Sequence, residues 1–301
     1  IAELCQNHNG SPKILKEMIK KASASGATHV KIQHIYSKCL SKRPIFENGI
    51  KINKKIVAIK RPYLKEFIRL KKLELDKKNI KVFINICKKY NVIPLTTCFT
   101  RGHVKELKKL GFREIKVASY DCASYQLLRD LKKNKYNHIY LSTGASYNQE
   151  ILFSSKILKN NFSLLHCITE YPTKINRINL SRMQFLKKYC KNVGYSDHTS
   201  PMKDGINASL VSIFLGAKVL ERHFTILNKD QTRDGPVSVN PSELKEISKF
   251  SKLTKKEQGK KLKQMKINIR ELIGKRNPKM SQLEILNRDY YRGRFVTYAN
   301  D

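Results

Sequence analysis

The sequence predicts an α/β fold over residues 1–270, a (β/α)₈ barrel of the TIM type. Short β-branched runs alternate with amphipathic, lysine-rich stretches along these residues. Such alternation predicts a parallel sheet, and eight repeats of the pair predict that the sheet closes into a barrel. A doubly wound open sheet is the alternative, but no Gly-x-Gly-x-x-Gly follows any predicted strand. Residues 271–301 lack this rhythm and are expected to form a linker or tail.

The predicted strands are short apolar runs at 1–5, 29–33, 92–97, 114–118, 138–142, 163–167, 193–196 and 218–223. The predicted helices have the apolar spacing of one buried face and lie near 12–25, 62–90, 102–110, 124–133, 148–159, 179–190, 203–215 and 241–270. The gap between the strand ends at Gln33 and Thr97 is longer than the others and accommodates an inserted loop.

Composition excludes several classes of protein. Hydrophobic residues make up 40% of the 301 residues, which argues against disorder. The longest apolar run, 208–219, contains Lys218 and is shorter than the ~20 residues of a membrane span. The seven cysteines contain no Cys-x-x-Cys pair, which argues against zinc ribbons and predicts reduced thiols. Without a visible signal peptide, we expect a cytoplasmic protein.

The formal net charge of +37 raises the alternative of a basic, non-catalytic barrel that binds nucleic acid. Lysine accounts for most of this charge and is spread over almost every predicted helix. Arginine is the residue that specific phosphate and base recognition favours. We therefore expect solvated lysine-rich faces and no specific nucleic-acid site.

Polar side chains follow nearly every predicted strand, where a barrel of this type carries its active site. Lys31 and Lys116, with the hydroxyls of Ser119, Ser142 and Ser196, would suit a phosphate and a carboxylate. Each lysine taken alone could instead extend to solvent along its aliphatic stem. Lys116 could also form a Schiff base, because a desolvated lysine can lose its proton.

His198 and His223 end two consecutive strands, and Asp197 and Glu221 flank them. Imidazoles on neighbouring strand ends can meet over the barrel mouth and bind one divalent metal ion. Tyr171 precedes Pro172 in a strand-end turn from which its phenol could reach a substrate.

Taken together, these strand ends resemble the N-acetylneuraminate (sialic acid) synthases and their nonulosonate relatives. The motifs in chain order are Glu3 with Asn-His-Asn-Gly at 7–10, Lys-Ile-Gln at 31–33, Thr-Thr-Cys-Phe at 96–99, Ile-Lys-Val-Ala-Ser at 115–119, Leu-Ser-Thr-Gly at 141–144, Leu-Leu-His-Cys-Ile-Thr-Glu-Tyr-Pro at 164–172, Gly-Tyr-Ser-Asp-His-Thr at 194–199 and Glu-Arg-His-Phe-Thr at 221–225. The resemblance covers about residues 1–250, in the family's order and spacing.

The resemblance implies condensation of phosphoenolpyruvate with N-acetylmannosamine, or a related 2-acetamido sugar, to a nine-carbon 2-keto acid. Phosphate would leave by C–O cleavage, and a divalent ion, Mn²⁺ by analogy, would assist at His198 and His223. A sister enzyme that makes pseudaminic or legionaminic acid is the alternative, since the acceptor sugar depends on loops.

The same resemblance assigns the remaining site residues. Phosphoenolpyruvate would be held by Lys31, Thr97, Lys116, Ser119, Ser142, Thr169 and Ser196. The sugar would meet Gln33, Asp121, Tyr171 and, with less direct correspondence, Asp234. Glu3 and Glu221 would act as acid/base or cation-stabilising groups.

Two departures from the family's pattern affect the sugar side. The loop after the eighth strand reads Arg-Asp-Gly-Pro-Val-Ser at 233–238, where many relatives have Pro-Gly-Pro-Asp. Bacterial relatives also commonly carry a C-terminal antifreeze-like domain whose arginine reaches the partner's site, and 271–301 is too short for it. We therefore expect a substitute arginine among Arg233, Arg288, Arg292 and Arg294, or a homodimer that supplies one.

Overall fold

A computed structural model describes residues 1–296 of the chain, and it confirms the closed parallel barrel. The barrel strands follow the order β1-β10-β9-β8-β7-β6-β5-β2. Their bounds are β1 (Ala2–Cys5), β2 (His29–His34), β5 (Ile93–Cys98), β6 (Glu114–Val117), β7 (His138–Ser142), β8 (Phe162–His166), β9 (Val193–Asp197) and β10 (Leu220–His223). Every predicted strand forms, and no strand end differs from its prediction by more than two residues.

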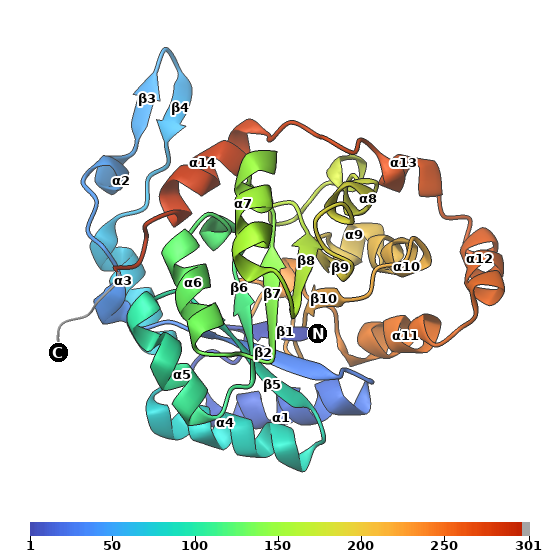
Figure 1. The fold of residues 1–301 in the computed structure, drawn as a ribbon, viewed down its shortest axis with the longest axis horizontal. Helices are drawn as coiled ribbons and strands as arrows, with labels where there is room; N and C mark the ends of the chain where they lie inside the picture. The colour runs from blue at the N-terminus through green and yellow to red at the C-terminus, as the bar shows by residue number, and fades with distance from the viewer. Residues whose placement is uncertain (297–301) are drawn as a thin grey trace.

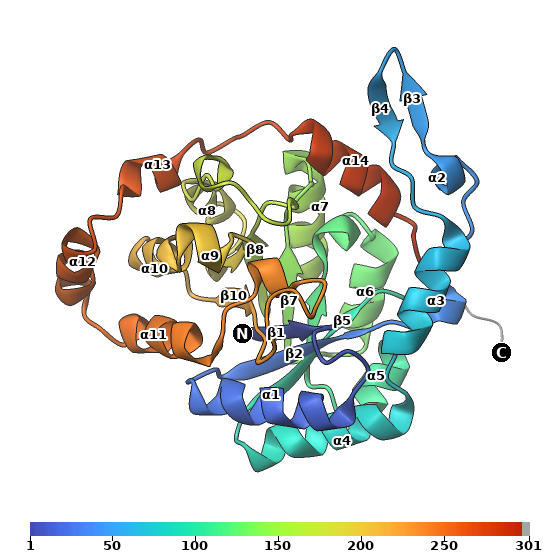
Figure 2. The same cartoon turned by 180° about the vertical axis from the view of Figure 1, so that it is seen from behind.

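Helices surround the barrel on its outer side (Figures 1 and 2). They are α1 (Pro12–Ala24), α3 (Tyr63–Leu73), α4 (Lys77–Lys89), α5 (Val104–Leu110), α6 (Tyr125–Lys133), α7 (Asn148–Leu158), α8 (Arg182–Leu186), α9 (Pro201–Asp204), α10 (Asn207–Phe214), α11 (Pro241–Ser251), α12 (Lys255–Gln264) and α13 (Ile269–Ile273). Short 3₁₀ turns lie at η1 (Ser37–Cys39), η2 (Arg101–His103), η3 (Ser119–Asp121), η4 (Ile175–Arg177) and η5 (Gly235–Val237). Among the residues the structure describes, no helix combines the length and apolarity needed to cross a membrane.

Three predicted helices are broken in the structure. The stretch 203–215 divides at Gly205, between α9 and α10, and the other two divide at capping residues. The stretch 62–90 divides into α3 and α4 because the Asp76 side chain accepts a hydrogen bond from the backbone N–H of Asn79, which starts a new helix. The stretch 241–270 divides because Thr254 and Glu257 form a capping box at the start of α12.

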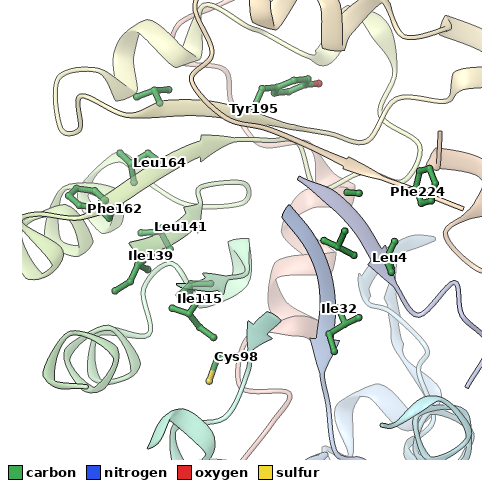
Figure 3. Packing of buried hydrophobic residues seen from close by; sticks show 14 of the residues in the cluster. Leu4, Ile32, Cys98, Ile115, Ile139, Leu141, Phe162, Leu164, Tyr195 and Phe224 are labelled. Atoms are coloured by element: carbon green, nitrogen blue, oxygen red, sulfur yellow. The ribbon is translucent and has the colours of Figure 1, made fainter. Parts of the chain in front are cut away.

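The main core lies between the strands and the surrounding helices. Outward-facing strand residues such as Leu4, Ile32 and Leu164 are fully buried there, as Figure 3 shows. Inside the barrel, Leu95 and Leu165 pack with Tyr140 below the strand ends. This apolar plug closes the interior and leaves only the carboxyl ends of the strands for a pocket.

Two segments outside the barrel repeat lie together near its mouth. Residues 34–60 form α2 (Ile45–Asn48) and a hairpin of β3 (Ile50–Ile52) and β4 (Lys55–Ala58), which projects as an arm in Figure 1. The segment expected to be a linker or tail instead contains α14 (Gln282–Tyr291), which contacts β4. Phe46 and Ala58 pack on Tyr290, so the two segments support each other.

Candidate active site

A pocket of about 420 Å³ opens at the carboxyl ends of the barrel strands. The parallel register brings the predicted residues to one level, because Glu3 pairs with Lys31 and His223 while Lys116 pairs with Thr97. The predicted site residues that line this pocket are Glu3, Lys31, Gln33, Thr97, Lys116, Ser119, Ser142, Tyr171, Ser196, His198, Glu221, His223 and Asp234.

Four charged side chains from four strands form the bottom of the pocket, and we call Glu3, Lys31, Lys116 and Glu221 the charged floor. Each of them is at most 5% exposed. Lys31 Nζ contacts the Glu3 carboxylate and lies 3.7 Å from Glu221 Oε2. Lys116 Nζ lies 3.6 Å from Glu221 Oε1 and donates a hydrogen bond of 2.6 Å to Ser142 Oγ. Buried charges persist only when they are paired, so each lysine depends on these carboxylates.

Burial and pairing shift the protonation of this floor in opposite ways. Burial lowers the pKa of Lys31 to about 7, although the Glu221 carboxylate partly opposes the shift. Burial also favours a protonated Glu221, but the ammonium groups of Lys116 and Lys31 outweigh it and hold the pKa of Glu221 well below its usual range. The floor therefore keeps an ionised carboxylate beside a lysine that titrates near neutral pH.

Hydroxyl groups surround the floor. Thr97 Oγ1 accepts a hydrogen bond of 3.1 Å from Lys31 Nζ, and Ser196 Oγ donates one of 2.8 Å to Glu221 Oε1. Ser119 Oγ lies 3.0 Å from Cys167 Sγ, at the side of the pocket. Together with the lysines, these groups offer an anion both charge and directed donors.

The two predicted metal-binding histidines face each other above the floor. Their ring centroids are 5.5 Å apart, and the Tyr171 ring lies 4.2 Å from that of His198. His198 Nδ1 lies 2.7 Å from the carbonyl oxygen of Ile168, so this nitrogen donates a proton and Nε2 keeps its lone pair. Such a backbone partner is the usual support of a histidine that binds metal through its other nitrogen.

A second group of metal-binding atoms shares only His223 with the predicted pair. Cys5, His223 and Asp234 each offer one ligand atom, and these atoms lie within 4.8 Å of one another. Asp234 also lies 3.9 Å from His223 Nδ1, which places this loop carboxylate on the metal side of the pocket. The sequence had assigned Asp234 to the sugar and had not singled out Cys5. The donor set nevertheless fits a divalent cation.

Asp197, which flanks the histidines in the sequence, is directed elsewhere. Its carboxylate pairs with Arg222 at 2.6 Å and accepts hydrogen bonds from Thr199 and Ser209, and both members of the pair are fully buried. Asp197 is therefore part of the barrel's structural support.

Two predicted residues do not line this pocket. Thr169 is buried behind it, where its backbone N–H donates to Glu284 on α14. Asp121 lines a neighbouring cavity of about 460 Å³, separated by Tyr120 and Tyr291, whose rings stack at 4.7 Å. Burial raises the pKa of Asp121 to about 7.

The structure adds an arginine rim, which we define as Arg61, Arg69, Arg233 and Arg294, around the mouth of the pocket. Arg69 forms a two-pronged pair with Glu66, and Arg294 lies 2.9 Å from the same carboxylate. Of the four candidate arginines, Arg233 and Arg294 line the pocket. Arg288 and Arg292 instead pair with Glu150 on α7. No sequence motif marks Arg61 or Arg69, because folding alone brings them to the mouth.

Six basic side chains line the pocket against three carboxylates, so the lining carries a positive excess. A pocket of this charge favours an anionic substrate. The buried lysines and hydroxyls lie on one side and the imidazoles on another, which provides an anion site next to a metal site.

Comparisons with known proteins agree with this geometry. The model of the NeuB family matches residues 18–263. The N,N'-diacetyllegionaminic acid synthase of Campylobacter jejuni is 35% identical to this chain, over 94% of this chain and 86% of that protein. A pseudaminic acid synthase of the same species is 27% identical, over 81% of this chain and 70% of that protein.

A solved structure supports the same relationship. The N-acetylneuraminic acid (sialic acid) synthetase of Leptospira borgpetersenii, in complex with citrate, matches with a TM-score of 0.70 and 26% identity, over 96% of this chain and 89% of that one. Sequence, fold and pocket lead to one conclusion: the chain belongs to the NeuB family.

Proposed function

We propose that this chain condenses phosphoenolpyruvate with a 2-acetamido sugar to form a nine-carbon 2-keto acid of the sialic acid type, with release of phosphate. Phosphoenolpyruvate condensation is the reaction of the NeuB synthases. The observation that carries the proposal is the charged floor, where two buried lysines and several hydroxyls lie beside a pair of imidazoles.

The floor would hold phosphoenolpyruvate through charge-assisted hydrogen bonds. Lys31 and Lys116 supply the positive charges, and Ser119, Ser142 and Ser196 supply donors of adjustable direction. Thr97 already accepts from Lys31, so it orients that ammonium group. Thr169 is not among the proposed phosphoenolpyruvate contacts, because its side chain does not line the pocket.

The carboxylates of the floor would stabilise charge in the reaction. The enol carbon attacks the sugar aldehyde, and the electrons of the enol double bond form the new C–C bond. The carbonyl electrons pass to the aldehyde oxygen, which takes up a proton and becomes a hydroxyl group. Water adds to the positive charge that develops at C2 and gives up a proton. The tetrahedral adduct then forms the keto group as its C–O bond to phosphate breaks. Glu221 is held ionised by the two lysines and suits stabilisation of that cation. Glu3, the other carboxylate of the floor, is the candidate for proton transfer.

His198 and His223 would hold a divalent ion, with Mn²⁺ the expectation from the family resemblance. When bound, such an ion polarises a carbonyl oxygen as a Lewis acid. The chain's own contribution is orientation, since the Ile168 carbonyl fixes the ring of His198.

The acceptor would lie above the floor, against Gln33 and Tyr171 and next to the metal side of the pocket, where Asp234 lies, with the arginine rim at its far end. The name of the C. jejuni relative with 35% identity indicates a product with two N-acetyl groups. We therefore propose a diacetamido sugar of the legionaminic type as the first acceptor to test, with N-acetylmannosamine and the pseudaminic type as alternatives.

A cytoplasmic location and a homodimer stay predictions. All seven cysteines are free thiols.

The decisive experiment measures phosphate release from phosphoenolpyruvate by the purified protein, with each acetamido sugar in turn and one divalent metal at a time. Labelled oxygen at the bridging position should leave with phosphate, and retention of the label in the keto acid would contradict C–O cleavage. Exhaustive chelation should stop turnover reversibly. No phosphate release with any sugar, together with steeply salt-dependent binding to nucleic acid, would favour the non-catalytic basic barrel.

A further inference from the structure

Cys5 occupies a position in the pocket that the proposed metal pair does not explain. It ends β1, beside β10, where Glu3 pairs with His223. The η5 loop brings Asp234 to the same place, and the Cys5 sulfur, one His223 nitrogen and one Asp234 oxygen lie within 4.8 Å of one another. Three segments thus converge on one small volume.

Burial and a ring nitrogen without a hydrogen-bond partner both favour a bound cation in this volume. Cys5 is 4% exposed and His223 is 6% exposed. His223 Nδ1 is buried and has no hydrogen-bond partner among the described residues, and the nearest carboxylate oxygen is that of Asp234 at 3.9 Å. A buried polar atom without a partner is costly, and a bound cation would remove this cost.

The backbone at Cys5 is shaped to direct the sulfur into the pocket. Its φ is +49°, a left-handed conformation that residues other than glycine rarely adopt, and the register with β2 shifts between Glu3 and Cys5. The Cys5 N–H is held by the Glu3 carboxylate at 2.5 Å. Glu3 and Cys5 both line the pocket, while Leu4 between them enters the core.

We propose that Cys5, as a thiolate, binds the divalent ion together with Asp234 and with His223, the one residue that this group shares with the histidine pair of the proposed function. This inference rests on the metal requirement in the proposed function. On binding, the thiol proton passes to solvent, and the two negative ligands balance the charge of the cation. A sulfur ligand favours Zn²⁺, Fe²⁺ or Co²⁺ over Mn²⁺, because thiolates are soft donors.

The geometry permits such a site with small movements. Bonds of the usual length at tetrahedral angles place ligand atoms about 3.6 Å apart, so the widest pair must close by about 1 Å. Rotation of the side chains can supply this movement, because neither His223 Nδ1 nor the Asp234 carboxylate is tied to the other by a hydrogen bond. The competing interpretation is that the Cys5 thiol stays protonated beside Asp234, because burial and that carboxylate raise the pKa of Cys5.

Cobalt provides a readout that does not depend on turnover. Metal-free protein, titrated with Co²⁺ without oxygen, should develop the near-ultraviolet band of sulfur-to-cobalt charge transfer. The variant Cys5→Ser should lose this band and bind Co²⁺ at least tenfold more weakly. The control Cys190→Ser, which changes a buried thiol that contacts the Phe162 carbonyl away from the pocket, should keep both.

A band that persists in Cys5→Ser, or cobalt bound by the wild type without any such band, would overturn the proposal and leave Cys5 as a protonated thiol beside Asp234. If Cys5→Ser does not fold, alkylation of the wild type decides the question. Zn²⁺ should protect Cys5 but not Cys190 from the reagent, as mapped by mass spectrometry, and equal labelling would contradict the assignment. Phosphate release is measured separately, so a cobalt band without turnover would refute the proposed function and not the ligand.

Discussion

The charged floor and the arginine rim are built in different ways, although they face the same pocket. The floor comes from strand ends that are fixed by barrel hydrogen bonds, and its four side chains are at most 5% exposed. The rim comes from loops, from α3 and from the residues after α14. The Arg233 and Arg69 side chains of the rim are 43% and 27% exposed, whereas that of Arg294 is 8% exposed.

This difference separates a part of the site that holds its ligand with fixed groups from a part whose groups can vary between relatives. Anchored charges on strands suit the phosphoenolpyruvate of the proposed function, because preorganised groups need no rearrangement during reaction. Three rim arginines, Arg69, Arg233 and Arg294, pair with the single carboxylate of Glu66. Arginines outside the barrel strands suit an acceptor that differs between relatives. We therefore expect floor variants to change the handling of phosphoenolpyruvate and rim variants to change the handling of the sugar.

The largest effect should come from the floor. Lys116→Met should lower kcat/KM for phosphoenolpyruvate by about 100-fold or more, because it removes an ammonium group and leaves Glu221 buried with one partner fewer. Phosphate release in steady state measures this, and the exposed Lys132→Met is the matched control. If borohydride with substrate traps a covalent adduct at Lys116, the lysine forms a Schiff base and the anion-site interpretation is wrong.

The next effect is a pH dependence from Lys31. Because burial lowers the pKa of Lys31 to about 7, the ammonium group is lost as pH rises, and kcat/KM for phosphoenolpyruvate should fall about tenfold per unit well above pH 7. The charged groups around Lys31 are Glu3, Lys116, Glu221 and Asp234.

The free energy of unfolding should change in the opposite direction. This separates loss of the Lys31 ammonium charge from loss of folded protein as the cause of a falling rate. Between pH 7 and the ordinary lysine value of 10.5, the unfolded chain binds more protons than the folded one at this position. The contribution of Lys31 to the free energy of unfolding therefore rises with pH across this range. The measurement compares the melting temperatures of the wild type and Lys31→Met as pH rises. If kcat/KM falls and the wild type also loses melting temperature relative to Lys31→Met, the assignment is contradicted.

The floor could be predicted from the sequence because a strand has a simple period. Inward positions alternate along each apolar run, and the polar residues at the ends of the strands then meet by topology alone. Cys5 carried this signal too, since it lies two positions after Glu3 on the same strand. It was missed because a single cysteine has no motif of its own.

Only half of the rim could be predicted from the sequence. Arg233 and Arg294 were among the candidate arginines, whereas Arg61 and Arg69 were not. Arg61 and Arg294 are far apart in the sequence, and both lie over the rings of Tyr290 and Tyr291, which pack against residues 34–60. The helix α14 did carry a local signal, a capping box of Ser281 and Glu284. That signal predicts where a helix begins and says nothing of the surface on which it packs.

A smaller effect should follow from the rim. Arg294→Ala should raise KM for the acceptor sugar about tenfold, the usual scale for one charge-assisted hydrogen bond, and leave KM for phosphoenolpyruvate within about twofold. Arg292→Ala is the matched control, because Arg292 is two positions away and pairs with Glu150 outside the pocket. Truncation after Lys275 should impair the acceptor in the same sense, but it also removes the buried Leu286 and Tyr290. Equal changes in both KM values would contradict the proposal that the floor binds phosphoenolpyruvate and the rim binds the sugar.

The smallest effect is expected at Asp121, where the family resemblance and the geometry disagree. The carboxylate lies in the neighbouring cavity, beyond the stacked rings of Tyr120 and Tyr291, and accepts a hydrogen bond of 3.0 Å from Ser124. Asp121→Asn keeps an oxygen for that bond, so KM for the acceptor should change by less than about threefold. Competition kinetics with two acetamido sugars of different length measure this change. A tenfold rise confined to the longer sugar would mean that the acceptor passes the tyrosine pair into the second cavity, and the sequence-based role of Asp121 would then hold.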